Sequence, residues 1–252
     1  MEAGAGLEQG VSLSLDENRV AGNGAVAQLP NVTPLSSPAP GVRLWWCALH
    51  ATSSQLRSFA SALSAAEHAR AGRFGNSLLR ERYIIGRAAL RTVLAEVLGV
   101  TAGSVAIVRG ARGRPQLDAG APLDFNVSHT GDVALIGVND HGRIGVDVER
   151  ADRSINVAGI ARKFLTLAER HGLAALDADA VRRNVLRLWT CKEAMSKATG
   201  DALSAPFAAI GIDLRDGPVL RDGPGKYRPG GWTLHAVEMP GDYLATLALW
   251  RG

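Results

Sequence analysis

The same order of expected elements occurs twice along the chain, and this repetition limits what it can fold into. In each half a capping box, at Ser64–Glu67 and at Thr166–Glu169, precedes a long amphipathic helix over 77–98 or 180–199. A glycine ends each helix, and a strand pair with a Gly-Asp turn follows. We therefore expect an α+β fold of two similar lobes in a pseudo-twofold arrangement, each a small antiparallel sheet packed against a long helix.

The repetition also indicates how the chain is divided. Residues 1–40 are rich in Gly, Ala, Ser and Pro, which is typical of a flexible N-terminal tail. We expect an N-terminal lobe over 41–140 and a C-terminal lobe over 141–252, and the likeness extends to Gly86–Leu90 against Cys191–Met195. Two lobes packed side by side leave a cleft, and clefts of this kind are common ligand sites.

Composition excludes several classes of protein. Hydrophobic residues make up 46% of the 252 residues and charged residues 21%, so a packed core is expected. The net charge of +4 suits an anionic ligand or an acidic partner, but no block of Lys and Arg points to nucleic acid. Two widely separated cysteines, Cys47 and Cys191, favour a reduced, cytoplasmic setting. Neither a signal peptide nor a run of about 18 apolar residues is present, so no membrane span is expected.

Two carboxylates lie two residues apart in a short apolar strand. Asp147 and Glu149 occur in Gly-Val-Asp-Val-Glu, and strand residues at this spacing point to the same face. Carboxylates held close together need a cation or a proton. The alternative is an exposed strand face on which Glu149 pairs with Arg150 or Arg153.

The second long helix places a third carboxylate on one stripe with a lysine and a tryptophan. Trp189, Glu193 and Lys197 are spaced i, i+4 and i+8, and Trp189 favours a partly buried face. A surface Glu-Lys pair is the alternative, yet this segment holds two of the only four lysines in the chain. Together with Asp147 and Glu149, Glu193 would complete a set of hard oxygen ligands that suits Mg²⁺ or Mn²⁺ beside a phosphate-bearing substrate.

Two further segments are candidates for binding phosphate. The loop Arg109–Pro115 contains three arginines and two glycines, which can surround an anion, although a solvated turn has the same composition. Ser128 and His129 end a strand with a polar tip, where a lone histidine can equally be structural. Arg70 reads as a solvated helix charge when it is taken alone.

Taken together, these segments resemble the surfactin-type (Sfp-type) 4′-phosphopantetheinyl transferases. The resemblance covers the chain from about residue 41 to its C-terminus, and the motifs occur in the order of that family. The matching segments are Gly113-Arg-Pro115, Phe125-Asn-Val-Ser-His-Thr-Gly131, Gly145-Val-Asp-Val-Glu149 and Trp189-Thr-Cys-Lys-Glu-Ala-Met-Ser-Lys197 with Gly200 after it. Val146 stands where isoleucine is commoner and Arg114 where lysine is frequent, and both changes keep shape or charge.

The resemblance implies roles for individual residues. Asp147, Glu149 and Glu193 would hold Mg²⁺, and Glu193 would also take the proton of the acceptor serine. Lys197 would contact the phosphates, with Lys192 assisting. Coenzyme A would be bound by the following residues: Arg70, Arg109, Gly110, Ala111, Arg112, Gly113, Arg114, Asn126, Val127, Ser128, His129 and Lys197.

The implied reaction transfers 4′-phosphopantetheine from coenzyme A to a serine of an acyl or peptidyl carrier protein and releases 3′,5′-adenosine bisphosphate. Charge neutralisation and positioning are what such a reaction requires. Two alternatives remain open: a Mg²⁺-dependent nucleotide hydrolase or nucleotidyl transferase, and a non-catalytic protein that binds coenzyme A or a carrier. Since two fused lobes could supply what a smaller transferase obtains by assembly, we expect a monomer.

Overall fold

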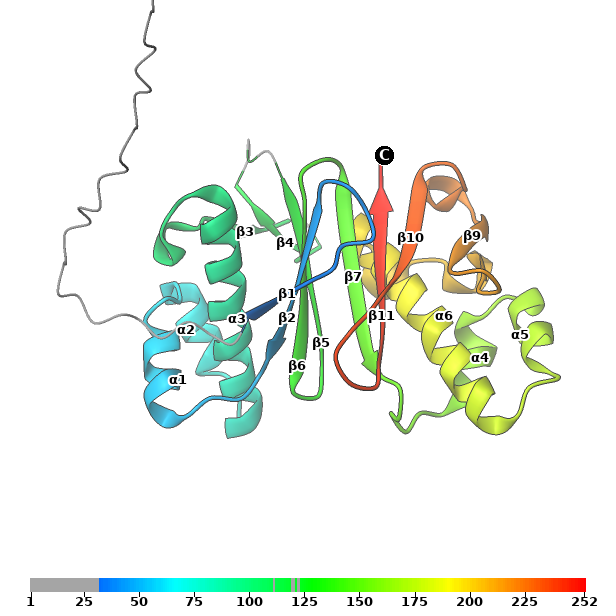
Figure 1. Ribbon diagram of the computed structural model, residues 1–252, viewed down its shortest axis with the longest axis horizontal. Helices are drawn as coiled ribbons and strands as arrows, with labels where there is room; N and C mark the ends of the chain where they lie inside the picture. The colour runs from blue at the N-terminus through cyan, green and yellow to red at the C-terminus, as the bar shows by residue number, and fades with distance from the viewer. Residues whose placement is uncertain (1–31, 111, 119–120, 122) are drawn as a thin grey trace, which may run out of the picture.

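The computed structural model has two groups of helices with strands between them (Figure 1). It describes residues 32–110, 112–118, 121 and 123–252. The expected α+β class is confirmed, because two small antiparallel sheets each pack against helices of their own half of the chain. Within these ranges, no helix is both long and apolar enough to cross a membrane.

The N-terminal half forms a four-stranded antiparallel sheet that packs against α3. The order across the sheet is β1 (Val32–Leu35), β2 (Val42–Ala48), β6 (Val133–Asn139) and β5 (Asp124–Thr130). The helices are α1 (Ser53–Ala60), α2 (Ala65–Ala71) and α3 (Ser77–Leu98), followed by a 3₁₀ turn (Ala102–Ser104) and a hairpin of β3 (Ile107–Arg109) and β4 (Pro115–Leu117). The apolar face of α3 and the inner sides of β2 and β6 make up the core of this lobe.

The C-terminal half repeats the plan with a three-stranded sheet. Its order is β10 (Trp232–Val237), β11 (Tyr243–Trp250) and β7 (Arg143–Arg150). The helices are α4 (Val157–Phe164), α5 (Leu167–Leu173) and α6 (Ala178–Thr199), with a hairpin of β8 (Gly211–Asp213) and β9 (Val219–Asp222). Short 3₁₀ turns lie at Ala202–Ser204, Phe207–Ala209 and Gly225–Tyr227. Both long helices have 22 residues and end at a glycine in the left-handed region, Gly99 (φ 67°) and Gly200 (φ 77°).

One sequence prediction was wrong at its boundary. Residues Val32–Leu35, expected in the flexible tail, form β1 and pair with Leu44–Cys47 of β2. Val32 and Leu35 pack against the apolar core, and Pro34 is tolerated because β1 is the edge strand of the sheet. Residues 36–40 of the expected tail connect β1 to β2, and residues 1–31 lie outside the described residues.

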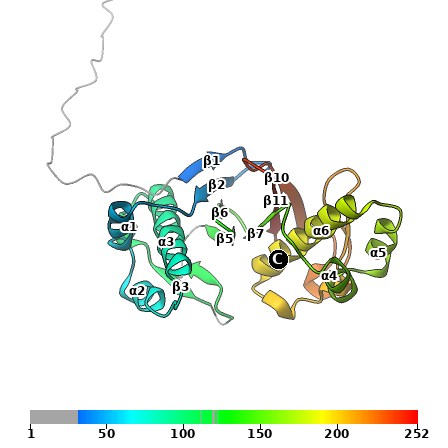
Figure 2. The ribbon, with the colours of Figure 1, turned by 90° about the horizontal axis from the view of Figure 1, so that it is seen from below.

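The two sheets meet along β5 and β7, which lie next to each other between the two groups of helices (Figure 2). Side chains of β5, instead of its backbone, accept hydrogen bonds from the backbone N–H groups of β7. These bonds run from Ile144 N to Asp124 Oδ2 (2.9 Å), from Val146 N to Asn126 Oδ1 (2.9 Å) and from Val148 N to Ser128 Oγ (3.3 Å). Every second residue of β5 therefore joins the lobes, and we call this row the seam.

Helix α6 packs directly on β7 at a glycine. A Cβ atom added to Gly145 would lie 1.9 Å from the carbonyl oxygen of Ala194 and 2.8 Å from the amide nitrogen of Ala198. No side chain fits into that space, so the glycine lets the helix and the strand approach each other. This close approach brings Glu193 and Lys197 of α6 to the strand that carries Asp147.

Candidate functional site

Asp147 lies at the centre of a polar cluster built from three elements. Its Oδ1 atom accepts hydrogen bonds from Lys197 Nζ on α6 (2.6 Å) and from Ser128 Oγ on β5 (2.7 Å). Lys197 Nζ also donates to Ser128 Oγ at 2.8 Å. The structure thus brings together three residues predicted from separate motifs, at the point where the seam meets α6.

The second carboxylate oxygen of Asp147 is an orphan acceptor. Asp147 is only 5% exposed, and its Oδ2 atom is buried without a hydrogen-bond partner among the described residues. Leaving a buried acceptor unpaired costs free energy of about 1–3 kcal/mol. Such an atom is therefore a candidate ligand for a cation or for a group brought by the substrate.

The negative charge of Asp147 acts on the pKa values of two neighbouring carboxylates, Glu149 and Glu193. Burial raises the pKa of Glu193, and the negative charges of Asp147 and Glu149 raise it further. Burial also raises the pKa of Glu149, and the charge of Asp147 adds a smaller contribution, while the hydrogen bond from Thr130 Oγ1 (2.9 Å) and the ion pair with Arg153 oppose the rise. Three carboxylates that repel one another in a partly buried place form a site for positive charge.

The carboxylates fit a hard divalent cation by chemistry, although their present arrangement does not form a coordination shell. No group of three His, Cys, Asp or Glu side chains in the described ranges is placed to hold a metal ion. Lys197 and Arg153 neutralise Asp147 and Glu149 instead. The orphan Oδ2 atom of Asp147 and the all-oxygen donor set nevertheless match what Mg²⁺ or Mn²⁺ requires.

A cavity of about 530 Å³ in the N-terminal lobe collects the predicted phosphate-binding residues Arg70, Arg109, Val127 and His129. His129 follows Ser128 on β5, so the two side chains point to opposite faces of the strand. The seam and the cavity therefore share this strand end. Although His129 is exposed, desolvation by the surrounding protein and the charge of Lys197 lower its pKa.

Several residues of α3 line the same cavity, and Arg82 and Tyr83 among them were not predicted to bind a ligand. Arg82 has a buried Nε–H group without a partner among the described residues, and Tyr83 lies under the guanidinium of Arg70 at 5.7 Å. Flat aromatic and guanidinium groups are suited to stack on a nucleobase. On a helix with many arginines, the sequence alone carried no signal that separated Arg82 from its solvated neighbours.

The structure does not bring the other loop arginines to this cavity. The β3–β4 pairing sets Arg109 opposite Pro115, and both line the cavity. Arg112, 61% exposed, bonds to Asp201 beyond the end of α6, and the buried Arg114 is bonded within the protein. Gly113 adopts φ 78° at the tip of this turn, where its carbonyl accepts from Arg109, and Gly110 bonds to the backbone of Arg114. Ala111 lies outside the described residues.

Asn126, also predicted to bind coenzyme A, uses its side-chain oxygen within the protein, where Oδ1 accepts the hydrogen bond from the Val146 N–H in the seam.

Lys192 lies away from the carboxylate cluster, contrary to the prediction. Its side chain is 0% exposed, and Nζ donates to Glu169 Oε2 (2.7 Å), to the Phe164 carbonyl (2.9 Å) and to the Phe207 carbonyl (2.8 Å). Burial lowers the pKa of Lys192, and Glu169 partly opposes this effect. All three N–H groups are used, so Lys192 holds the C-terminal lobe together and we assign it no role in the reaction.

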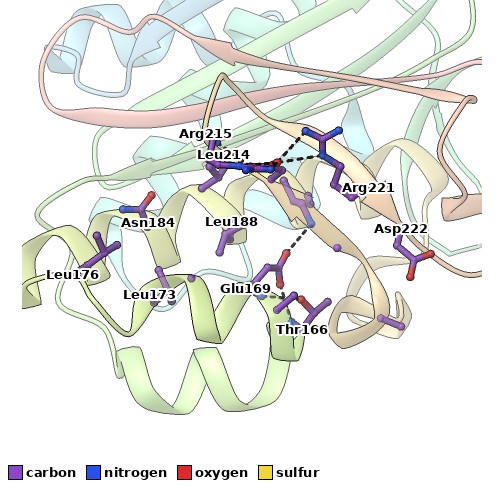
Figure 3. Close-up of a pocket in the computed structure, with 16 residues that line it drawn as sticks. Thr166, Glu169, Leu173, Leu176, Asn184, Leu188, Leu214, Arg215, Arg221 and Asp222 are labelled. Atoms are coloured by element: carbon purple, nitrogen blue, oxygen red, sulfur yellow. Dashed lines mark hydrogen bonds and ion pairs between the residues drawn. The ribbon is translucent and has the colours of Figure 1, made fainter.

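A larger cavity of about 680 Å³ lies between α5, α6 and the β8–β9 hairpin (Figure 3). Leucines such as Leu173 and Leu188 line it, and Arg215 and Arg221 share Asp213 at its edge. Within the described ranges, its lining includes none of the residues predicted for the site. Cavity size therefore does not point to the predicted site here, whereas the neighbouring carboxylates with raised pKa values mark a candidate site.

Two family models match the chain and meet between β6 and β7. The model described as "4'-phosphopantetheinyl transferase, N-terminal" matches residues 47–141. The model described as "4'-phosphopantetheinyl transferase superfamily" matches residues 143–248, which include the carboxylate cluster.

Curated relatives carry the same description. The chain is 38% identical over 178 residues to the 4′-phosphopantetheinyl transferase HetI of Nostoc sp. The aligned region covers 69% of this chain and 74% of the relative. It is 28% identical over 189 residues to the 4′-phosphopantetheinyl transferase ffp of Bacillus subtilis, covering 75% and 83%. It is 32% identical over 121 residues to the 4′-phosphopantetheinyl transferase AcpT of Escherichia coli K12, covering 48% and 58%.

Proposed function

Since the chain belongs to the 4′-phosphopantetheinyl transferase superfamily and is an enzyme of that class, we propose that it is of the surfactin type and modifies a carrier protein. It moves 4′-phosphopantetheine from coenzyme A to a carrier serine and releases 3′,5′-adenosine bisphosphate. The observation that supports this proposal is the Asp147–Lys197–Ser128 cluster, because it adjoins an arginine-lined cavity through His129.

Coenzyme A lies with its nucleotide end in the cavity of the N-terminal lobe. Arg70, Arg82 and Arg109 bind its phosphates, including the 3′-phosphate, and Tyr83 offers a flat surface to the base. His129 and Lys197 then face the pyrophosphate, where the two lobes meet. The cavity volume of about 530 Å³ lies in the usual range for a ligand of this kind.

Asp147, Glu149 and Glu193 hold Mg²⁺, with Mn²⁺ as an alternative. When bound, the ion supplies positive charge to the pyrophosphate oxygens. Lys197 and Arg153, which neutralise Asp147 and Glu149 in the structure, leave these carboxylates and become available to anions of the substrate.

Glu193 accepts the proton of the carrier serine. The serine oxygen forms a bond to the β-phosphorus of coenzyme A, and the bond from that phosphorus to the oxygen of the leaving bisphosphate breaks. The raised pKa of Glu193, caused mainly by burial, makes it a stronger base than an ordinary carboxylate. Lys197 stabilises the charge that develops on the leaving group.

The protein partner is an acidic acyl or peptidyl carrier protein. The net charge of +4 favours encounter with such a partner. We further propose that the enzyme works as a monomer in the cytoplasm, where the buried, free thiols of Cys47 and Cys191 remain reduced.

Intact-mass spectrometry of an apo carrier protein incubated with the enzyme, coenzyme A and Mg²⁺ tests this proposal. The carrier should gain the mass of one phosphopantetheine, and EDTA should prevent the gain. The Asp147→Asn variant is the matched control, because it removes one charge and keeps the shape of the side chain. Coenzyme A binding without any gain in mass, across fatty acid, polyketide and peptide carriers, would instead support a non-catalytic binding protein.

A further inference from the structure

Arg114 is a buried hub at the place where the two lobes and the end of α6 meet. Its side chain is 7% exposed, and it forms an ion pair with Asp124. The guanidinium binds the Asp124 carboxylate with two bonds, from Nη1 to Oδ1 (2.9 Å) and from Nη2 to Oδ2 (2.7 Å). Nη2 also donates to the carbonyls of Phe125 (3.0 Å) and Ile144 (2.8 Å). Nε donates to the carbonyl of Lys197 (2.8 Å). One side chain therefore binds β5, β7 and α6 at once.

The bond to Lys197 links this hub to the catalytic cluster. The carbonyl of Lys197 lies in the last turn of α6, where carbonyl groups lack the regular helical donor, and it accepts from the capping Gly200 N (3.3 Å) in addition to Arg114. The side chain of the same residue reaches Asp147 Oδ1 at 2.6 Å. Arg114 thus holds the backbone of Lys197 against the strand that carries Asp147.

Asp124 completes the hub. Its Oδ2 atom also accepts the N–H of Ile144 at 2.9 Å, so Arg114 and Asp124 satisfy both backbone groups of that residue. Because each nitrogen of Arg114 already has an acceptor, the guanidinium has no free edge with which to bind a phosphate. A direct contact with coenzyme A would require this hub to break.

We propose that Arg114 is a positioning residue, which fixes the backbone of Lys197 beside the strand that carries Asp147 by tying the last turn of α6 to the seam. The proposal rests on the transferase function proposed above. Displacement of a catalytic group by about 1 Å can cost about 100-fold in rate. Loss of the Arg114 fork should therefore lower turnover, while the cavity that binds coenzyme A stays intact.

Arg114→Gln tests the proposal, with Arg91→Gln as the matched control. Arg91 is a second buried arginine, bonded to Glu67 and to two backbone carbonyls, but it lies wholly within the N-terminal lobe. In Arg114→Gln we expect kcat to fall about 10- to 100-fold and the Kd for coenzyme A, from calorimetry without carrier, to change less than about threefold. Arg114→Lys should retain intermediate activity, because an ammonium keeps the charge but not the fork.

Different outcomes separate the possible roles. A Kd for coenzyme A that rises about tenfold with unchanged kcat would overturn the proposal in favour of direct binding. Unchanged kcat and Kd in folded Arg114→Gln, with only a lower Tm, would leave Arg114 with a purely structural role. Arg91→Gln should lower the Tm and leave the kcat of the folded protein unchanged.

Hydrogen exchange tests the hub even if the wild-type protein transfers nothing. Arg114→Gln should speed amide exchange in residues 144–148 and in the last turn of α6, without affecting α3. Arg91→Gln should speed amide exchange in α3 without affecting residues 144–148 or the last turn of α6. Unchanged exchange at the seam in Arg114→Gln would contradict the inference, whereas a wild-type protein that modifies no carrier would contradict the proposed function alone.

Discussion

Arg91 and Lys192 are each the fifteenth residue of a 22-residue helix, and each binds the glutamate of a capping box. Arg91 Nε lies 2.7 Å from Glu67 Oε2, and Lys192 Nζ lies 2.7 Å from Glu169 Oε2. Each cation also donates to two backbone carbonyls. This pair relates the two lobes residue by residue, and it differs from the likeness expected from the sequence, which set Arg87 opposite Lys192.

The equivalence predicts that Lys192 contributes to stability and not to catalysis. Lys192→Met leaves Glu169 buried without its cation and should lower the free energy of unfolding by about 3–5 kcal/mol. Urea denaturation would measure the loss, and the kcat of the folded fraction should stay within about twofold of wild type. If turnover fell about 100-fold at conditions where the variant is fully folded, Lys192 would have a catalytic role after all.

Glu193→Gln should abolish transfer and stabilise the protein at neutral pH. Removal of a general base costs about 10²- to 10⁴-fold in rate. Because the pKa of Glu193 is higher in the folded than in the unfolded state, its ionisation opposes folding. The stability of the wild type should therefore rise as pH falls from the folded pKa toward the unfolded value near 4.5.

Thermal unfolding of both proteins at pH 7 and pH 5 measures this effect. The Tm of Glu193→Gln should exceed that of wild type at pH 7, and the difference should shrink at pH 5. A lower Tm at pH 7 would mean that the ionised Glu193 makes stabilising contacts that outweigh its burial.

Local signals predicted much of the fold. The bounds of α3 were predicted correctly, because turn residues and terminal glycines act over a few neighbours. The strand pair with a Gly-Asp turn that was expected after each long helix was confirmed as β5–β6 and β10–β11. β1 was missed because its short edge strand, interrupted by Pro34, has the composition of a tail.

The site could be predicted only where a strand or helix motif fixes the direction in which a side chain points. The strand that carries Asp147 and the helix stripe that carries Glu193 and Lys197 were expected to lie at one site, and the structure places Lys197 in contact with Asp147. By contrast, an arginine in a glycine-rich loop looks the same in sequence whether it binds phosphate, as expected of Arg114, or a carboxylate 10 residues away, as found. The partners of Arg114 and Lys192 depend on tertiary contacts that no local pattern encodes.

Arg82→Ala should weaken coenzyme A binding more than it lowers turnover. Its buried Nε–H group lacks a partner in the described part of the chain and lines the cavity with Arg70 and Arg109. A lost charged hydrogen bond of about 1.5–3 kcal/mol corresponds to a rise in the KM for coenzyme A of roughly 10- to 150-fold. Arg80→Ala, an exposed arginine on the same helix, is the control and should leave KM unchanged. Equal KM values for both variants would place the nucleotide elsewhere.

Gly145→Ala should separate α6 from β7 and lower both stability and turnover. The added Cβ would lie 1.9 Å from the carbonyl oxygen of Ala194, a backbone atom that can move only if the whole helix shifts. We expect the free energy of unfolding to fall by about 3 kcal/mol or more, and kcat to fall with it because the backbone of α6 at Glu193 and Lys197 moves away from the strand that carries Asp147. Gly172→Ala, in helix α5 and with no atom within 4 Å of the added Cβ, is the control and should stabilise the protein by up to about 1 kcal/mol. Urea denaturation and carrier modification by both variants would decide the matter: a Gly145→Ala protein as stable and active as wild type would show that the contact between α6 and β7 does not set the geometry of the site.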